Sequence, residues 1–335
     1  MIPQNHTLVP VPLSATSEET LKAYAKIFAN SLDADAPLAG IELPELTSAI
    51  AHRRDHFSRR AVFIATDASA LKAKLEAFAN GEAAADAADD VPASVISGNE
   101  LGAPKIAFTF SGQGSQWWAM GRALLEKEPV YRKSVEDFDA LFAPLAGWSV
   151  IDAMMEDESS SQVDRSAVTQ PTICALQIAL AALWRHRGVV PDMVIGHSLG
   201  EVAAAHVAGA IDLETAVRYI HTRSLIGAKA SGQGAMAVVG LAEDELASLL
   251  PSDGSIEIAG YNAPTTLTIT GDASAIESFI ASLNAERPEV FTRGVKTDTA
   301  WHSHLLEAGE AWFRAAVGEI AYKTPTIPFV STVTG

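Results

Sequence analysis

The sequence predicts an α/β protein built around a buried parallel sheet. Short apolar runs that do not alternate with polar residues, at 106–110 and 193–195, are typical of strands covered on both faces. Longer segments with helical spacing separate these runs, as the connections between parallel strands require. A third stretch, 230–296, predicts a different pattern in which strands outnumber helices. We therefore expect a parallel core with a second, smaller sheet inserted into it.

Residues 1–100 predict a separate N-terminal α/β domain. Helical spacing covers 18–32, 43–54 and 68–79, and an apolar run at 61–65 predicts a strand. The stretch 82–98 is rich in Ala, Asp and Ser, which favours an exposed loop.

The core is expected at 105–229 and again at 297–335, with 230–296 inserted between the two halves. Within the insert, the predicted order is strand, helix, strand, strand, helix, strand, at 235–239, 243–250, 256–262, 266–271, 273–283 and 290–295. This β-α-β-β-α-β order is that of a ferredoxin-like subdomain. The insert would cap the core and leave an active-site cleft between them.

The segment Gly196-His197-Ser198-Leu199-Gly200 joins an apolar strand to an Ala-rich helix. In this context a G-x-S-x-G pattern predicts a nucleophile elbow, a tight turn that exposes the serine hydroxyl at a helix N-terminus. The helix dipole and the free N–H groups there favour developing negative charge. Ser198 is thus the candidate nucleophile of a hydrolase-like core.

Composition limits the possible functions. The chain has 335 residues, 48% of them hydrophobic, and a net charge of −17, which argues against nucleic acid as a partner. The single cysteine, Cys174, lies in an apolar helical stretch, so we expect a buried thiol in a reducing, cytoplasmic setting. No Cys and His spacing predicts a metal site. No hydrophobic run approaches the roughly 20 residues of a membrane span, so we expect no such span, and we expect no secretion signal.

Four further segments accompany the elbow in a fixed order. They are the strand and Gly-rich turn 106–116, Thr169-Gln170-Pro171, Arg223, and Ala300-Trp301-His302-Ser303. Together with the elbow, they resemble the acyltransferase domain of polyketide synthases and, more distantly, the malonyl-CoA:acyl-carrier-protein transacylases. The resemblance runs from about 106 to 335. Residues 46–62 more loosely resemble the linker that precedes this domain and follows a ketosynthase.

The resemblance implies roles for individual residues. Ser198 would be the nucleophile and His302 the base, with His304 as its competitor. The backbone N–H groups of Gln113 and Leu199 would bind the oxyanion. A late backbone carbonyl at Thr332 would orient the imidazole.

The acyl group would contact Arg223, Gln170, Trp301 and Thr299. A guanidinium at position 223 suits the free carboxylate of a malonyl-type extender. Leu199 and the bulky Trp301 fit malonyl, whereas Thr299 and the tryptophan itself depart from the common pattern and leave a less usual extender open.

The implied reaction loads malonyl from CoA and passes it to the phosphopantetheine arm of an acyl carrier protein, with a neighbouring ketosynthase and no bound cofactor. An acidic carrier would dock on Arg53-Arg54, Arg59-Arg60 or Arg185-His186-Arg187, or these clusters balance nearby acids on solvated faces. A serine esterase or thioesterase and a non-catalytic scaffold remain the alternatives.

Overall fold

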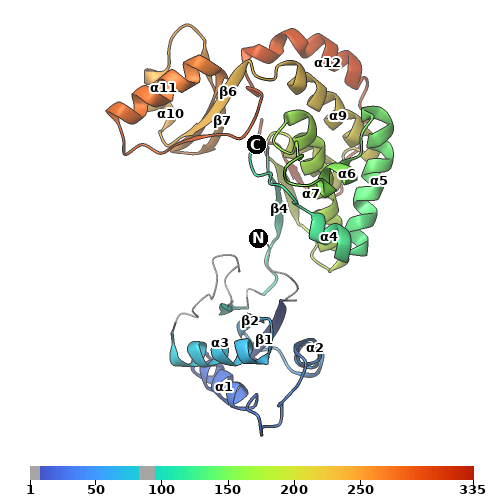
Figure 1. Ribbon diagram of the computed structural model, residues 1–335, viewed down its shortest axis with the longest axis vertical. Helices are drawn as coiled ribbons and strands as arrows, with labels where there is room; N and C mark the ends of the chain where they lie inside the picture. The colour runs from blue at the N-terminus through green and yellow to red at the C-terminus, as the bar shows by residue number, and fades with distance from the viewer. Residues whose placement is uncertain (1–7, 83–94, 101) are drawn as a thin grey trace. The chain divides into compact units, whose positions relative to one another are not determined.

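The computed structural model describes residues 8–82, 95–100 and 102–335, and the chain forms two compact units, Met1–Pro104 and Lys105–Gly335 (Figure 1). Each unit has its own hydrophobic core. The α/β class expected from the sequence is present in both.

The first unit is a three-stranded antiparallel sheet with helices packed against it. Its elements are β1 (Val9–Ala15), α1 (Glu18–Asn30), α2 (Leu43–Arg53), β2 (Arg59–Ala65), α3 (Ala68–Asn80) and β3 (Val95–Asn99). The strand order is β1-β2-β3. Helices α1 and α3 start where they do because the side chains of Ser17 and Asp67 accept hydrogen bonds from the free amides of the first turn.

Two strands of this unit were not predicted. In β1 every second residue is buried, but Pro10 and Pro12 stand between the buried positions and obscure the alternation. Prolines are tolerated there because β1 is an edge strand, whose outer N–H groups need no partner. The predicted loop 82–98 was wrong at its end, where β3 pairs with β2. Residues 83–94 of that loop lie outside the described part of the chain.

The second unit contains a parallel sheet in the order β10-β5-β4, formed by β4 (Ala107–Phe110), β5 (Met193–Gly196) and β10 (Phe329–Val330). The helices around it are α4 (Arg122–Lys127), α5 (Pro129–Ala146), α6 (Val150–Met155), α7 (Ser166–His186), α8 (Gly200–Ala208), α9 (Leu213–Lys229) and α12 (Glu310–Val317), the last preceded by a 3₁₀ turn at His304–Gly309.

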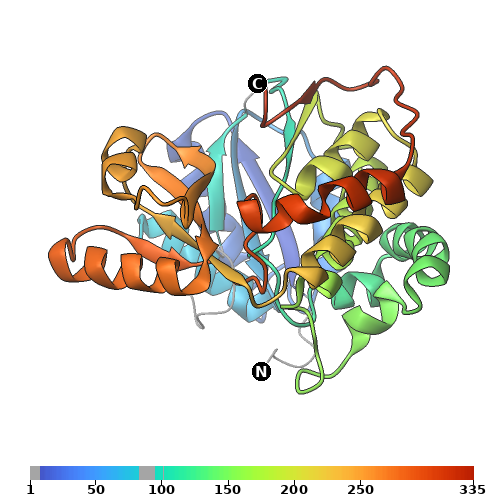
Figure 2. The same ribbon diagram turned by 90° about the horizontal axis from the view of Figure 1, so that it is seen from above.

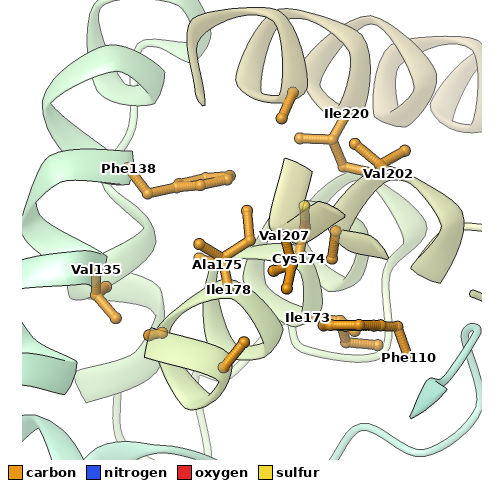
Figure 3. Packing of buried hydrophobic residues seen from close by; sticks show 14 of the residues in the cluster. Phe110, Val135, Phe138, Ile173, Cys174, Ala175, Ile178, Val202, Val207 and Ile220 are labelled. Atoms are coloured by element: carbon orange, nitrogen blue, oxygen red, sulfur yellow. The ribbon is translucent and has the colours of Figure 1, made fainter. Parts of the chain in front are cut away.

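Figure 3 shows the core of this unit, where side chains from α5, α7, α8 and α9 meet. Phe138 lies on α5, and Ala175 and Ile178 lie on α7, which packs against α5. Cys174 is fully buried in the same cluster, and burial raises the pKa of its thiol to about 12. It is therefore the buried core thiol that the sequence predicted.

Helix α7 corrects one expectation. It is 21 residues long with a mean hydropathy of 1.4 over its most apolar stretch, so by length and composition alone it could cross a membrane. The expectation that no apolar run approaches this length was wrong. However, 72% of that stretch is buried inside the unit, against α5, α8 and α9, as for the central helix of a globular core.

The inserted segment folds into a second, antiparallel sheet with two helices on it, which Figures 1 and 2 show beside the helical core. Its elements are β6 (Gly234–Val239), α10 (Glu243–Leu249), β7 (Ile256–Ala263), β8 (Thr266–Asp272), α11 (Ala273–Glu286) and β9 (Thr292–Gly294). The strand order is β7-β8-β6-β9. Apolar side chains of α10 and α11, including Leu246 and Ile276, close one face of this sheet.

Candidate active site

Ser198 lies at the turn between β5 and α8, with a positive φ of 53°. Two glycines make this turn possible. A Cβ on Gly196 would lie 2.4 Å from the backbone of Glu201, and one on Gly200 would lie 2.2 Å from the carbonyl oxygen of Phe110. Neither position has room for a side chain, so the strand and the helix can approach closely enough to expose the hydroxyl.

The Ser198 Oγ is 2.8 Å from the Nε2 of His302, which reaches it from the loop before the 3₁₀ turn. His302 also has a positive φ, 62°, a strained conformation of the kind that gathers at functional sites. Its ring is exposed to the cavity but largely surrounded by protein. Burial, with the nearby charge of Arg223, lowers the pKa of His302 to about 4. The imidazole is therefore neutral at physiological pH and can accept a proton.

His304 makes different contacts. Its Nδ1 is 3.1 Å from Glu257 and its Nε2 is 3.6 Å from Asp272, both on the antiparallel sheet. The geometry therefore places His302, and not its competitor, at Ser198.

The contact expected to orient His302 is not found in the described part of the chain, where no hydrogen bond joins its ring to the carbonyl of Thr332. Instead, the Thr332 hydroxyl donates to the carbonyl of Gly196, and its backbone N–H donates to Glu201 at 2.8 Å. Glu201, in the first turn of α8, thus joins Thr332 to the elbow.

Arg223 projects from α9 toward the nucleophile. Its Nη2 donates to the Ser198 Oγ at 3.1 Å, and its Nη1 is buried without a hydrogen-bond partner in the described part of the chain. Burial lowers the pKa of the guanidinium to about 10, so it stays charged. A partly buried cation with a buried, unused donor beside a nucleophile is a ready site for an anionic group, because leaving that donor unpaired is costly.

Gln113 and Gln170 lie next to each other on the wall of the cavity, joined by a hydrogen bond from Gln170 Nε2 to Gln113 Oε1. The side chain of Gln113 also donates to Ser166 and Thr297. Leu199 is buried behind the elbow, and its backbone N–H belongs to the free amides at the start of α8.

Trp301 lines the cavity, whereas Thr299 does not. The Trp301 ring lines the cavity, with the Arg223 guanidinium 4.3 Å from its centroid. Thr299 is fully buried outside the cavity, where its hydroxyl donates to the carbonyl of Gly227. The structure therefore does not place the Thr299 side chain on the cavity wall, and its contact with the acyl group stays a prediction.

A cavity of about 570 Å³ lies between the helical core and the antiparallel sheet. The core side of its wall includes Ser198, His302, Arg223, Gln113, Gln170 and Trp301, and the sheet supplies Met236, Val238, Tyr261, Asn262 and Thr268. His197 connects the two sides, because its Nε2 lies 3.2 Å from the Asn262 Oδ1.

Glu201 and Asn262 line the cavity but were not predicted as site residues from the sequence. Glu201 lines the cavity and binds Thr332, and its position directly after the elbow glycine could have singled it out. Asn262 carried no such signal, since its approach to His197 depends on how the two sheets meet. No cluster of potential metal ligands occurs among the described residues.

The acyl transferase domain family matches residues 107–335. The chain belongs to this family. Across 97% of its length it is 36% identical to polyketide synthase GfsB of Streptomyces halstedii and, over the same share, to erythronolide synthase EryA2 of Saccharopolyspora erythraea.

Solved acyltransferase domains have the same α/β fold. The acyltransferase domain of module 8 of the salinomycin polyketide synthase matches 98% of this chain at 32% identity, with a TM-score of 0.86, and 75% of that domain is covered. The acyltransferase domain of SpnD, in complex with 2-(pent-4-yn-1-yl)malonyl, matches with a TM-score of 0.79 at 28% identity, over 98% of this chain and 74% of that one. The chain spans only 6% of GfsB and 9% of EryA2, which are far longer proteins.

Proposed function

We propose that this acyltransferase domain moves a malonyl-type acyl group from coenzyme A onto Ser198 and then onto the phosphopantetheine thiol of an acyl carrier protein. The observation that carries the proposal is the meeting of three groups. The Ser198 hydroxyl lies within hydrogen-bond distance of a neutral imidazole and of a buried guanidinium that still has a free donor. Base and nucleophile alone would suit many hydrolases, whereas the guanidinium selects an acyl chain that ends in a carboxylate.

In the first half-reaction the Ser198 oxygen attacks the thioester carbonyl while His302 Nε2 takes its proton. The carbonyl oxygen becomes an oxyanion, for which the N–H groups of Leu199 and Gln113 are the donors we propose. Its collapse breaks the carbon–sulfur bond, and His302 returns the proton to the departing thiolate. The product is a malonyl ester of Ser198 and free coenzyme A.

The second half-reaction reverses these roles. His302 takes the proton of the carrier's thiol, and the sulfur attacks the ester carbonyl through a second oxyanion. The Ser198 oxygen leaves and regains the proton from His302. Throughout, the Arg223 guanidinium would hold the acyl carboxylate, to which it can make two parallel hydrogen bonds.

Selection of malonyl over larger extenders would depend on Trp301, which occupies the wall beside Arg223. One extra methyl group in an apolar pocket changes binding by only about 1–3 kcal/mol, so bulk must supply the discrimination. Because Thr299 lies outside the cavity, we propose that it supports the loop rather than contacts the acyl group. Gln170, fully buried at the cavity wall, would complete the acyl pocket.

The remaining assignments are also proposals. A carrier protein and a ketosynthase are the expected partners because the similar proteins are polyketide synthases. We propose a cytoplasmic setting, with no bound cofactor beyond the CoA thioester and the carrier's arm. The strand order β7-β8-β6-β9 supports a ferredoxin-like subdomain at 230–296, and the parallel sheet with its elbow supports a hydrolase-like core at 105–229 and 297–335. Residues 1–100 would be the linker that follows a ketosynthase.

Two of the three basic clusters use part of their charge in contacts within the chain. Arg187 pairs with Glu128, and Arg60 pairs with Glu100. Arg185 donates to the carbonyl of Val207. These contacts favour a structural use of the clusters around 60 and 186.

Intact-protein mass spectrometry tests the proposal. After brief incubation with malonyl-CoA, we expect a malonyl adduct that is absent from Ser198→Ala and is discharged by a carrier protein bearing its phosphopantetheine arm. Release of free malonate faster than transfer to the carrier would indicate a thioesterase. An unmodified chain, with the fold intact by circular dichroism, would indicate a scaffold.

A further inference from the structure

Gly227 occupies the last turns of α9, four residues after Arg223 on the same side of the helix. A Cβ at this position would lie 2.3 Å from Cζ2 and 2.5 Å from Cη2 of Trp301. Its φ is not positive, so the backbone does not require glycine there. The requirement is for space alone: the six-membered ring of the indole fills the place of a side chain at 227.

The indole that packs against Gly227 also stacks on the Arg223 guanidinium. The guanidinium carbon is 4.3 Å from the ring centroid, and Trp301 as a whole is 5% exposed. Its Nε1 donates to Ser166 at 3.4 Å, which fixes the rotation of the ring. The contacts therefore form a series: Gly227 on α9 contacts the indole of Trp301, the indole contacts the guanidinium of Arg223, and the guanidinium contacts the Ser198 Oγ.

We propose that Gly227 is a specificity-determining residue of the acyl site. By admitting the Trp301 indole into α9, it sets the plane of the Arg223 guanidinium and keeps the ring out of the space that a short dicarboxylyl group needs. Stacking on an aromatic face holds a guanidinium flat and leaves its edge free for a carboxylate, which planar two-point recognition requires. This inference rests on the proposed acyl transfer, and it names the substrate class as short dicarboxylyl thioesters.

The test is Gly227→Ala, followed by its malonyl and acetyl loading rates. The added methyl group displaces the indole toward the cavity and tilts Arg223 from its present plane. We expect malonyl loading to fall about tenfold or more, the range of an overpacked site, while acetyl loading changes less than about threefold. Alanine favours a helix more than glycine does, so α9 itself is not weakened.

Gly294→Ala is the matched control. A Cβ there meets no atom within 4 Å, and its φ is not positive, so this variant should load as the unchanged chain does.

The double variant Gly227→Ala/Trp301→Phe makes the test specific. Phenylalanine lacks the two indole atoms that would meet the new methyl group, so the double variant should regain malonyl preference over Gly227→Ala alone. With Trp301→Phe alone as the fourth corner of the cycle, such recovery measures a direct coupling between the two positions. Melting temperatures of all variants will show whether each one folds. If Gly227→Ala alone unfolds, the double variant still tests the proposal.

The outcomes separate this inference from the function on which it rests. If the unchanged chain forms no malonyl adduct, the proposed function fails and the inference with it. If the unchanged chain loads malonyl but Gly227→Ala keeps the same malonyl-to-acetyl ratio, only the inference is overturned. The same holds if the double variant is no more selective for malonyl than the single one.

Discussion

The two sides of the candidate active site are held in different ways. Ser198 lies in a turn fixed by its immediate neighbours, the glycines at 196 and 200 and the strand and helix that they join. His302 lies in a loop whose position depends on residues far away in the chain. Both carry a positive φ without being glycine, so both need outside support to stay in place. The nucleophile is placed by local geometry and the base by tertiary contacts.

Asp298 is the main support of the His302 loop. Its carboxylate accepts the N–H of Ser166 at the start of α7 and the hydroxyl of Ser231 after α9. Its backbone carbonyl accepts the N–H of Gly232. Burial opposes ionisation of this carboxyl, but the hydrogen bonds from Ser166, Ser231 and Thr299 outweigh it and lower its pKa. The loop is thus attached to two helices through one anion.

The largest effect should come from the local side. Gly200→Ala places a methyl group against the carbonyl of Phe110, which belongs to backbone and cannot rotate away. We expect a loss of about 3 kcal/mol or more in stability and no malonyl adduct. Urea unfolding measures the stability, and mass spectrometry measures the malonyl adduct. A stable, active Gly200→Ala would show that the elbow is not held by this close approach.

Asp298→Ala should give the next largest effect, with the elbow intact. The N–H of Ser166 and the Ser231 hydroxyl lose their acceptor, at a cost of about 1–3 kcal/mol. A displaced His302 should slow loading about 10- to 100-fold. Both urea unfolding and loading kinetics are needed. Destabilisation without slower loading would show that the loop holds His302 by other contacts.

The stabilising contribution of Asp298 should depend on pH. Its pKa is lower in the folded protein, so its stabilising contribution is present above the unfolded pKa and is lost as the pH falls through the folded one. We expect the stability difference between the unchanged chain and Asp298→Ala to shrink on acidification. Melting temperatures measured across acidic pH will check this.

Loading itself should depend on His302. With its pKa lowered to about 4, the imidazole stays neutral above that pH, and the loading rate should fall only as the pH drops through about 4. Arg223→Met removes one of the charges that disfavour the protonated ring, so the acidic limb should move to higher pH. If the acidic limb of the pH profile does not move, Arg223 is not a cause of the lowered pKa of His302.

The smallest effect is expected at Thr332. Thr332→Val removes the hydroxyl that donates to Gly196 and Glu201, at a cost of about 1 kcal/mol. Because Thr332 contacts the elbow and not the His302 ring, the acidic limb of the pH profile should not move. A shifted limb would restore the orienting role expected from the sequence.

Much of the site could be predicted because its signals are short in sequence. The elbow needs two glycines around one serine between a strand and a helix, and this pattern is fixed by backbone crowding alone. The inserted segment was equally readable, since alternating strands and amphipathic helices carry their own periodicity. Strand β1 was missed for a physical reason, because prolines on its outer edge hide a pattern of buried residues.

Three features followed from local sequence: Ser198 lies at the start of a helix, Arg223 lies on the next helix, and 230–296 forms its own sheet. Three others required the folded chain: His302 rather than His304 reaches Ser198, Thr332 binds Glu201, and Gly227 makes room for Trp301. The first group depends on hydrogen bonding and crowding between near neighbours. The second depends on the packing of side chains from distant segments, which no local pattern encodes.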